Sequence, residues 1–267
     1  MSNNKKILLA VLVSLLVFGV AKFFYEETDF EISDCNIERI KLRGYLSTYV
    51  LYNNASDGLE ATGGDDVSSS EEIVKAIEMA NKDDSIKAIL LEVDSFGGSG
   101  VAGQDIAEAL KRANKPTVAL IKESGLSAAY WAASGADYII ASNISDVGSI
   151  GVTMSYLDYS QKDKDEGIIY QELSSGKFKN TGDPDKSISY EEKELIMRDI
   201  KIIHENFVKD ISKNRNLEID KVGKLADGSY MLGQMAKEAG LIDKVGNIYD
   251  AEDYFAQKIG EEPIICQ

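Results

Sequence analysis

The 267-residue chain has few of the residues on which metal sites and disulfide scaffolds depend. It contains two cysteines, Cys35 and Cys266, and a single histidine, His204. Two cysteines cannot supply a four-cysteine zinc site or a framework of several disulfides. A single Cys35–Cys266 bridge and two free thiols both remain open at this point. We expect no metal and no cofactor.

Basic residues are also scarce, since 29 lysines and arginines stand against 45 aspartates and glutamates. The formal net charge of −16 repels phosphate backbones, so we expect no nucleic-acid partner. Three prolines exclude a proline-rich or collagen-like chain. Hydrophobic residues make up 44% of the chain, which is enough to build a sizeable core.

One long apolar run lies near the N-terminus, over residues 7–21, with Lys5 and Lys6 before it and Lys22 after it. As a helix, residues 7–25 would extend about 28 Å, close to the thickness of a bilayer's hydrocarbon core. We therefore expect residues 1–25 to be a single-pass anchor in the cell membrane. The positive-inside rule then puts residues 26–267 on the extracytoplasmic side. The alternative is a cleaved signal peptide with a small-x-small site at residues 19–21.

From residue 37 onward, short apolar runs alternate with segments of helical periodicity. Two capping boxes, Ser69-x-x-Glu72 and Ser189-x-x-Glu192, predict helix starts. This alternation is typical of βαβ units, so we expect one α/β domain with a mainly parallel sheet and flanking helices. The expected strands are 40–50 (as a pair), 88–93, 117–121, 138–141 and a β-rich run at 168–173. The expected helices follow Ser69, cover 101–113, and begin at Ser127 and at Ser189.

Three segments differ from what a core or a solvated surface uses. Residues 94–100 place Gly97 and Gly98 between a strand and a helix, where backbone N–H groups can face an anion. Ser127 lies among small residues at a helix start, where it is either an ordinary N-cap or a nucleophile. Residues 173–179 carry Lys177 and Lys179, and a lysine that burial keeps uncharged can act as the base for a serine.

These segments belong to a series of five motifs between residues 37 and 250. Residues 86–98 end in Phe96-Gly97-Gly98, and residues 127–131 read Ser-Ala-Ala-Tyr-Trp. In this order the motifs resemble the signal peptide peptidase A family, the serine–lysine peptidases of family S49. Phe96 stands where that family usually has proline, and alanines follow Ser127 where glycines are usual, as in phage-type members. The other three motifs are residues 147–152, 175–179 and 227–243.

The resemblance implies a ClpP/crotonase-like fold, after the membrane anchor, and a serine endopeptidase with a Ser-Lys dyad. By position, Ser127 is the nucleophile and Lys179 the general base, with Ser149 holding the lysine by a hydrogen bond. The backbone N–H groups of Gly98 and Ala128 form the oxyanion hole. The spacing of the motifs favours Lys179 over its neighbour two residues earlier.

Family members cleave residual signal peptides or other short apolar peptides. They form homo-oligomers, in some of which the serine and the lysine of one site come from different subunits. Three alternatives stay open. The chain could be a catalytically inactive membrane-anchored scaffold, a crotonase-like acyl-CoA enzyme, or a hydrolase with a Ser-His-Asp triad. The triad would need His204, whose helical setting beside Glu205 fits a surface or flank position better.

Overall fold

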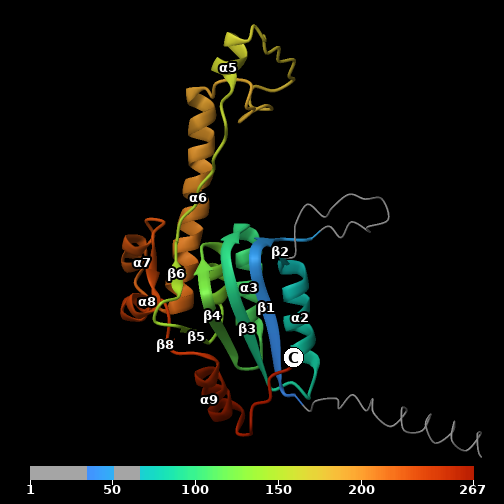
Figure 1. Cartoon of the computed structure of the whole chain (residues 1–267), viewed down its shortest axis with the longest axis vertical. Helices are drawn as coiled ribbons and strands as arrows, with labels where there is room; N and C mark the ends of the chain where they lie inside the picture. Colours follow the sequence, from blue (N-terminus) through green and yellow to red (C-terminus); the bar gives the residue numbers. More distant parts are fainter. Residues whose placement is uncertain (1–34, 51–66) are drawn as a thin grey trace, which may run out of the picture. The chain divides into compact units, whose positions relative to one another are not determined.

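The computed structural model describes residues 35–50 and 67–267, and Figure 1 labels their helices and strands. The predicted anchor, residues 1–25, lies outside the described residues. Within the described ranges, no helix has both the length and the hydrophobicity that a membrane crossing needs. Residues 35–267 form one structural unit, to which everything below refers.

Eight strands in this part of the chain form one sheet, and every pairing except that of β6 with β7 is parallel. The main path runs β2-β1-β3-β4-β5-β8, while β6 pairs with the last residues of β4 and with β7. The predicted mainly parallel sheet is therefore confirmed. The strands are β1 (Ile37–Ser47), β2 (Val67–Ser69), β3 (Ala88–Gly98), β4 (Thr117–Leu126), β5 (Tyr138–Ala141), β6 (Asp146–Gly148), β7 (Tyr230–Leu232) and β8 (Lys244–Val245).

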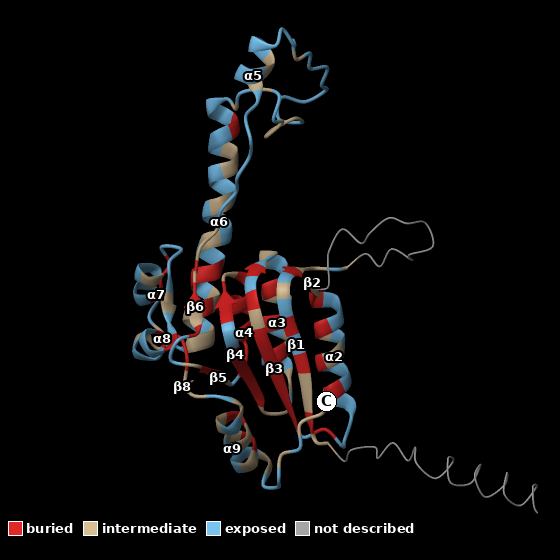
Figure 2. Ribbon diagram, viewed as in Figure 1, coloured by how far each residue is buried: buried red, intermediate tan, exposed pale blue. Residues whose placement is uncertain are grey.

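Helices cover both faces of this sheet, as Figures 1 and 2 show. The strand β3 is buried on both faces of the sheet. Alternate side chains of a strand point to opposite faces, so neighbouring residues of β3 enter different cores. Ile89 and Leu91 join a large core with α2, α3 and α4, whereas Leu90 joins a second core with Phe255 of α9. The described helices are α2 (Ser70–Lys82), α3 (Gly100–Arg112), α4 (Ala128–Ala133), α5 (Ser160–Asp165), α6 (Tyr190–Arg215), α7 (Ile219–Leu225), α8 (Gly233–Ala239) and α9 (Ile248–Ile259).

Both predicted capping boxes mark the start of a helix. Ser69 is the N-cap of α2, and its side chain accepts a hydrogen bond from the amide of Glu72. Ser189 caps α6 in the same way, and the Glu192 side chain closes the box on the Ser189 backbone. Satisfying these free amides fixes where each helix begins.

The long helix α6 packs on the body only through its C-terminal half. Phe207, Val208 and Ile211 are buried there, but the first half of the helix is largely exposed (Figure 2). Together with α5 and its flanking segments, this first half projects away from the sheet (Figure 1). We call residues 152–200 the arm. Glu192 is its only buried residue.

Two predicted strands are wrong. The expected pair over residues 40–50 is one continuous strand, β1, because Ile37–Ser47 finds parallel partners on both sides. The expected strand at 168–173 is absent, since this stretch lies in the arm with no neighbouring strand to receive its backbone hydrogen bonds. Residues there are exposed or half-buried, so the local β-branched composition alone did not produce a strand.

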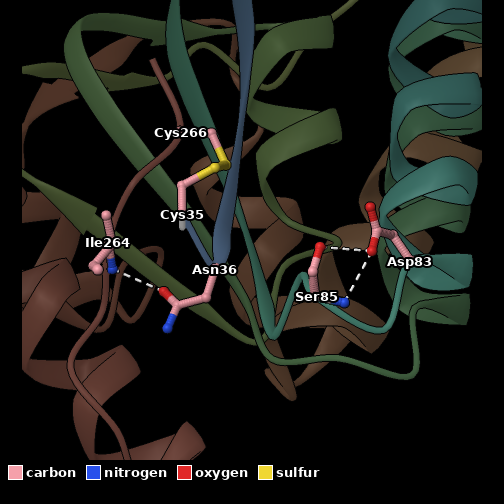
Figure 3. The surroundings of a disulfide bond; sticks show 6 residues. All are labelled: Cys35, Asn36, Asp83, Ser85, Ile264 and Cys266. Atoms are coloured by element: carbon pink, nitrogen blue, oxygen red, sulfur yellow. Dashed lines mark hydrogen bonds between the residues drawn. A yellow bond between two sulfur atoms is a disulfide. The ribbon is translucent and has the colours of Figure 1, made fainter. Parts of the chain in front are cut away.

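A disulfide joins Cys35 to Cys266 and ties the end of the chain to the start of β1 (Figure 3). The Cys266 amide donates to the Ile37 carbonyl at 2.9 Å, and the Ile264 amide donates to Asn36 Oδ1 at 2.8 Å. Because 231 residues separate the two cysteines, the bridge closes almost the whole described unit into one loop. Of the two states open from the sequence, the structure contains the bridge.

Candidate active site

Three predicted site residues lie where neighbouring strands end. Gly98 is the last residue of β3, Ser127 directly follows β4, and Ser149 directly follows β6. These strands are parallel, so their carboxyl ends meet at the same edge of the sheet, where Leu126 pairs with Gly148. Open α/β sheets bind ligands at this edge.

Ser127 occupies a sharp turn between β4 and α4 with an unusual backbone conformation. Its φ and ψ are 52° and −125°, and a positive φ costs a residue with a side chain about 1–3 kcal/mol. The turn is held by the Ser127 amide, which donates to the Gly148 carbonyl at 2.8 Å. The Ser127 side chain makes no capping hydrogen bond. Ser127 thus occupies the N-cap position of α4 without capping the helix through its side chain, so the helix end does not use its hydroxyl.

Gly97 allows the end of β3 to pass close to this turn, and Gly98 allows it to pass close to Leu46 of β1. A Cβ atom on Gly97 would lie 2.9 Å from the Cβ of Ser127 and 2.8 Å from the Leu126 carbonyl oxygen. A Cβ atom on Gly98 would lie 2.1 Å from the Leu46 carbonyl oxygen. Both residues also have positive φ, so the approach requires glycine at each position.

A cleft of about 930 Å³ opens at this edge of the sheet. It brings together four of the five predicted site residues: Gly98, Ser127, Ala128 and Ser149. The other lining residues come mainly from α3, α4, α6 and the 226–228 segment, and they are both apolar and polar. These include Phe96, Val101, Trp131, Val152, Ile203, His204, Phe207 and Asp227.

Ser149 is fixed by backbone groups of the segment that follows α7. Its hydroxyl donates to the Gly228 carbonyl at 3.0 Å, and its amide donates to the Ser229 carbonyl at 3.0 Å. Its φ of 51° is again positive. Asp227 closes the same turn by accepting hydrogen bonds from the hydroxyl and amide of Ser229, and these bonds hold the pKa of Asp227 below its usual value.

Lys179, the fifth predicted residue, is not in the cleft. It is an exposed residue of the arm, and its amide donates to the Gly176 carbonyl at 3.0 Å. One chain therefore does not assemble the predicted Ser127–Lys179 pair. Lys177 is also outside the cleft and forms an exposed ion pair with Glu191 at 3.1 Å.

His204 is a cleft residue that the sequence analysis assigned to a surface or flank position. It is half-buried, and its Nε2 lies 2.9 Å from the Ala226 carbonyl oxygen. Among the described residues, no hydrogen bond joins His204 to Ser127 or to a carboxylate, so a Ser-His-Asp triad is not formed there. His204 lies three and seven residues before the buried Phe207 and Ile211, a helical spacing that places His204 on the packed side of α6. This spacing could have identified His204 from the sequence.

No group of three or more histidine, cysteine, aspartate or glutamate side chains in the described ranges is arranged to hold a metal ion. The cleft thus offers a serine hydroxyl, backbone amides and apolar walls. These groups suit acyl transfer to a serine.

A family model for peptidase family S49 matches residues 109–260, a range that includes Ser127, Ser149 and Lys179. The match covers more than half of the chain. The chain belongs to peptidase family S49. The family predicted from the motifs, that of the signal peptide peptidases, is thereby confirmed.

Three relatives illustrate the similarity of this S49 chain to other proteins. A candidate protease of Methanocaldococcus jannaschii is 37% identical over 180 residues, which are 67% of this chain and 58% of the relative. A candidate signal peptide peptidase of Enterococcus faecium is 29% identical over 243 residues, covering 88% and 69%. Protease 4 of Haemophilus influenzae is 30% identical over 205 residues, covering 76% and 32%. The chain thus spans less than two thirds of the first and third of these relatives.

Proposed function

We propose that the protein is a serine endopeptidase in which Ser127 is the nucleophile and Lys179 of a neighbouring copy is the general base. The observation that carries this proposal is the strained turn that presents Ser127 to the cleft with no capping bond on its hydroxyl. Membership of a peptidase family agrees with it. The parallel sheet and its flanking helices also agree with the ClpP/crotonase-like fold that we propose for the domain.

In the proposed reaction, neutral Lys179 takes the proton of Ser127 as the hydroxyl attacks a peptide carbonyl. The backbone N–H groups of Gly98 and Ala128 stabilise the oxyanion that develops on the carbonyl oxygen. The protonated lysine then gives its proton to the leaving amine. Neutral Lys179 then takes a proton from a water molecule that attacks the acyl-enzyme, and it returns that proton to the Ser127 oxygen as the ester bond breaks and the acid product leaves. Ser149 orients the lysine throughout.

The arm supports a site completed by a second copy of the chain. The arm, which carries Lys179, exposes large apolar side chains, with 77% of Ile169, 100% of Leu173 and 74% of Tyr190 accessible to solvent. Exposed apolar groups gathered in one projecting segment indicate an interface. Docking on a neighbour would bury this segment, and burial favours the uncharged form that a lysine base requires.

The cleft favours an apolar peptide as substrate. Trp131 and Phe207 form its floor, while Phe96 and Val101 extend the apolar surface to an exposed rim. We therefore propose residual signal peptides or other short apolar peptides as substrates.

A membrane-anchored position on the extracytoplasmic side fits two features of the chain. As a helix, residues 7–25, which include the apolar run, would be long enough to serve as the anchor, through which the protein would contact the membrane. The Cys35–Cys266 bridge suits an oxidising compartment, because disulfides persist outside the cytoplasm.

A fluorophosphonate probe, which reacts with activated serines, tests the proposal on the full-length protein. We expect labelling of the wild type, none of Ser127→Ala, and full labelling of Ser124→Ala. Ser124 is a suitable control because its buried hydroxyl has no hydrogen-bond partner and lies outside the cleft. A wild type that neither reacts with the probe nor cleaves peptides would favour the inactive scaffold.

A further inference from the structure

We infer that His204 is a positioning residue, which holds the segment at residues 226–229 in place and through it orients Ser149. The inference rests on the proposed function, because Ser149 matters only if it holds the lysine base. His204 belongs to α6, the helix that also carries part of the arm. Its ring reaches across the cleft wall to the segment that follows α7.

The hydrogen bond of His204 defines its chemical state. Its partner is the Ala226 carbonyl oxygen, 2.9 Å from Nε2, and a carbonyl oxygen can only accept. Nε2 therefore carries a proton, and the ring acts as a donor. In this role, His204 only donates a hydrogen bond to Ala226 and transfers no proton during the reaction.

Three further hydrogen bonds connect the anchored segment to Ser149 and to the next residue, Ile150. The hydroxyl and the amide of Ser149 donate to the carbonyls of Gly228 and Ser229, each at 3.0 Å. The Gly228 amide donates to the Ile150 carbonyl at 3.1 Å. The segment is thus bonded on one side to the strand end that carries Ser149 and on the other to α6 through His204.

Ser149 depends on this support because its conformation is strained. A residue at a φ of 51° keeps that conformation only where its surroundings impose it. The bond to Gly228 also uses the proton of the Ser149 hydroxyl, which leaves the oxygen lone pairs to accept from a lysine amine. If the segment moved, the direction of these lone pairs would change.

Two matched amide variants test the role of the ring. Glutamine places its Nε2 as many bonds from Cβ as histidine does, so His204→Gln can still donate to Ala226. Asparagine is one methylene shorter, so His204→Asn keeps the amide but cannot reach. We expect kcat for an apolar fluorogenic peptide to fall about tenfold in His204→Asn and His204→Ala, the order of one lost hydrogen bond. His204→Gln should stay within about threefold of the wild type, with KM unchanged in all three.

The outcomes separate this role from two others. A His204→Gln variant as inactive as Ser127→Ala would overturn the inference, because the ring would then be transferring a proton during the reaction. A change in KM with unchanged kcat would overturn it as well, because His204 would then be only a wall of the cleft. Equal activity of the Gln and Asn variants would show that the Ala226 bond has no role.

A second measurement does not require activity. Amide hydrogen exchange at Ser149 and Gly228 should be faster in His204→Asn than in the wild type and unchanged in His204→Gln. If the wild type cleaves no peptide, the proposed function fails while this exchange pattern still tests the anchoring. Equal exchange in both variants would overturn the inference even in an active enzyme.

Discussion

Trp131 stacks on Phe207, with ring centroids 4.4 Å apart and planes within 5° of parallel. Trp131 belongs to α4, the short helix that starts directly after Ser127, and Phe207 belongs to α6. The indole Nε1 also donates to Asp210 of α6 at 3.2 Å. The helix that carries the nucleophile turn is therefore fixed to the helix that carries the arm.

Replacing Phe207 with alanine should lower the free energy of unfolding by about 3–5 kcal/mol. The change removes a buried aromatic ring and leaves a cavity beside its stacking partner, Trp131. Denaturant unfolding followed by tryptophan fluorescence measures this, since Trp131 is the only tryptophan. Tyr249→Ala is the control; this residue is 71% exposed on α9 and should change stability by less than about 0.5 kcal/mol. Similar values for the two variants would contradict the packing described here.

Gly97→Ala should remove probe labelling of Ser127. The added Cβ would collide with Ser127 and with the Leu126 carbonyl, and the residue would have to keep a φ of 101°. The control is Gly223→Ala in α7, where the added methyl group meets no other atom within 4 Å. This variant should leave the free energy of unfolding unchanged or raise it by up to about 1 kcal/mol. Normal labelling of the Gly97 variant would show that the turn does not need this close approach.

The N-terminus of α6 should loosen in acid. Glu192 accepts hydrogen bonds from the backbone and hydroxyl of Ser189 and pairs with Lys186 at 3.0 Å, which lowers its pKa from 4.5 to about 2. A lowered folded-state pKa stabilises the folded form above pH 4.5, and this stabilisation is lost as the pH falls from 4.5 to 2.

Hydrogen exchange across the arm, compared between Glu192→Gln and the wild type at each pH, checks this prediction. The variant should exchange faster at pH 6, and the ratio of the two rates should approach one near pH 2. A ratio independent of pH would mean that the charge of Glu192 does not hold the arm.

Reducing the Cys35–Cys266 bridge should lower the free energy of unfolding by about 2–4 kcal/mol, because the unfolded chain regains the freedom that the cross-link removes. Thermal unfolding with and without dithiothreitol measures the effect. The double variant Cys35→Ser/Cys266→Ser should unfold at the temperature of the reduced wild type and should not respond to the reductant. A wild type that is insensitive to full reduction would contradict a stabilising bridge.

The sequence predicted those features that depend on contacts within one element or between neighbouring strands. The capping boxes at Ser69 and Ser189 placed two helix starts, because the cap bonds are local. The mainly parallel pairing of the strands followed from the alternation of strands and helices. Gly98, Ser127 and Ser149 were named by the family resemblance, and the structure brings them together in one cleft because parallel strands end on the same side.

The features that the sequence did not predict depend on distant contacts or on contacts that one chain lacks. The stretch 168–173 has strand-forming residues but no partner strand in the arm. His204 reaches the cleft only because α7 and the segment after it fold back beside α6. Motif spacing could identify Lys179 as a candidate base, yet it could not say from which subunit Ser127 would receive it.

The central claim is that Ser127 of one subunit works with Lys179 of another, and mixing two inactive variants tests it most directly. Ser127→Ala and Lys179→Ala should each be inactive alone, while Lys177→Ala, the control in the same segment, should remain active. Oligomers refolded from equal amounts of the two inactive variants should recover about one quarter of wild-type turnover, because random assembly puts an intact serine beside an intact lysine at that fraction of interfaces. Mixed oligomers with no turnover, or full turnover by Lys179→Ala alone, would contradict the claim.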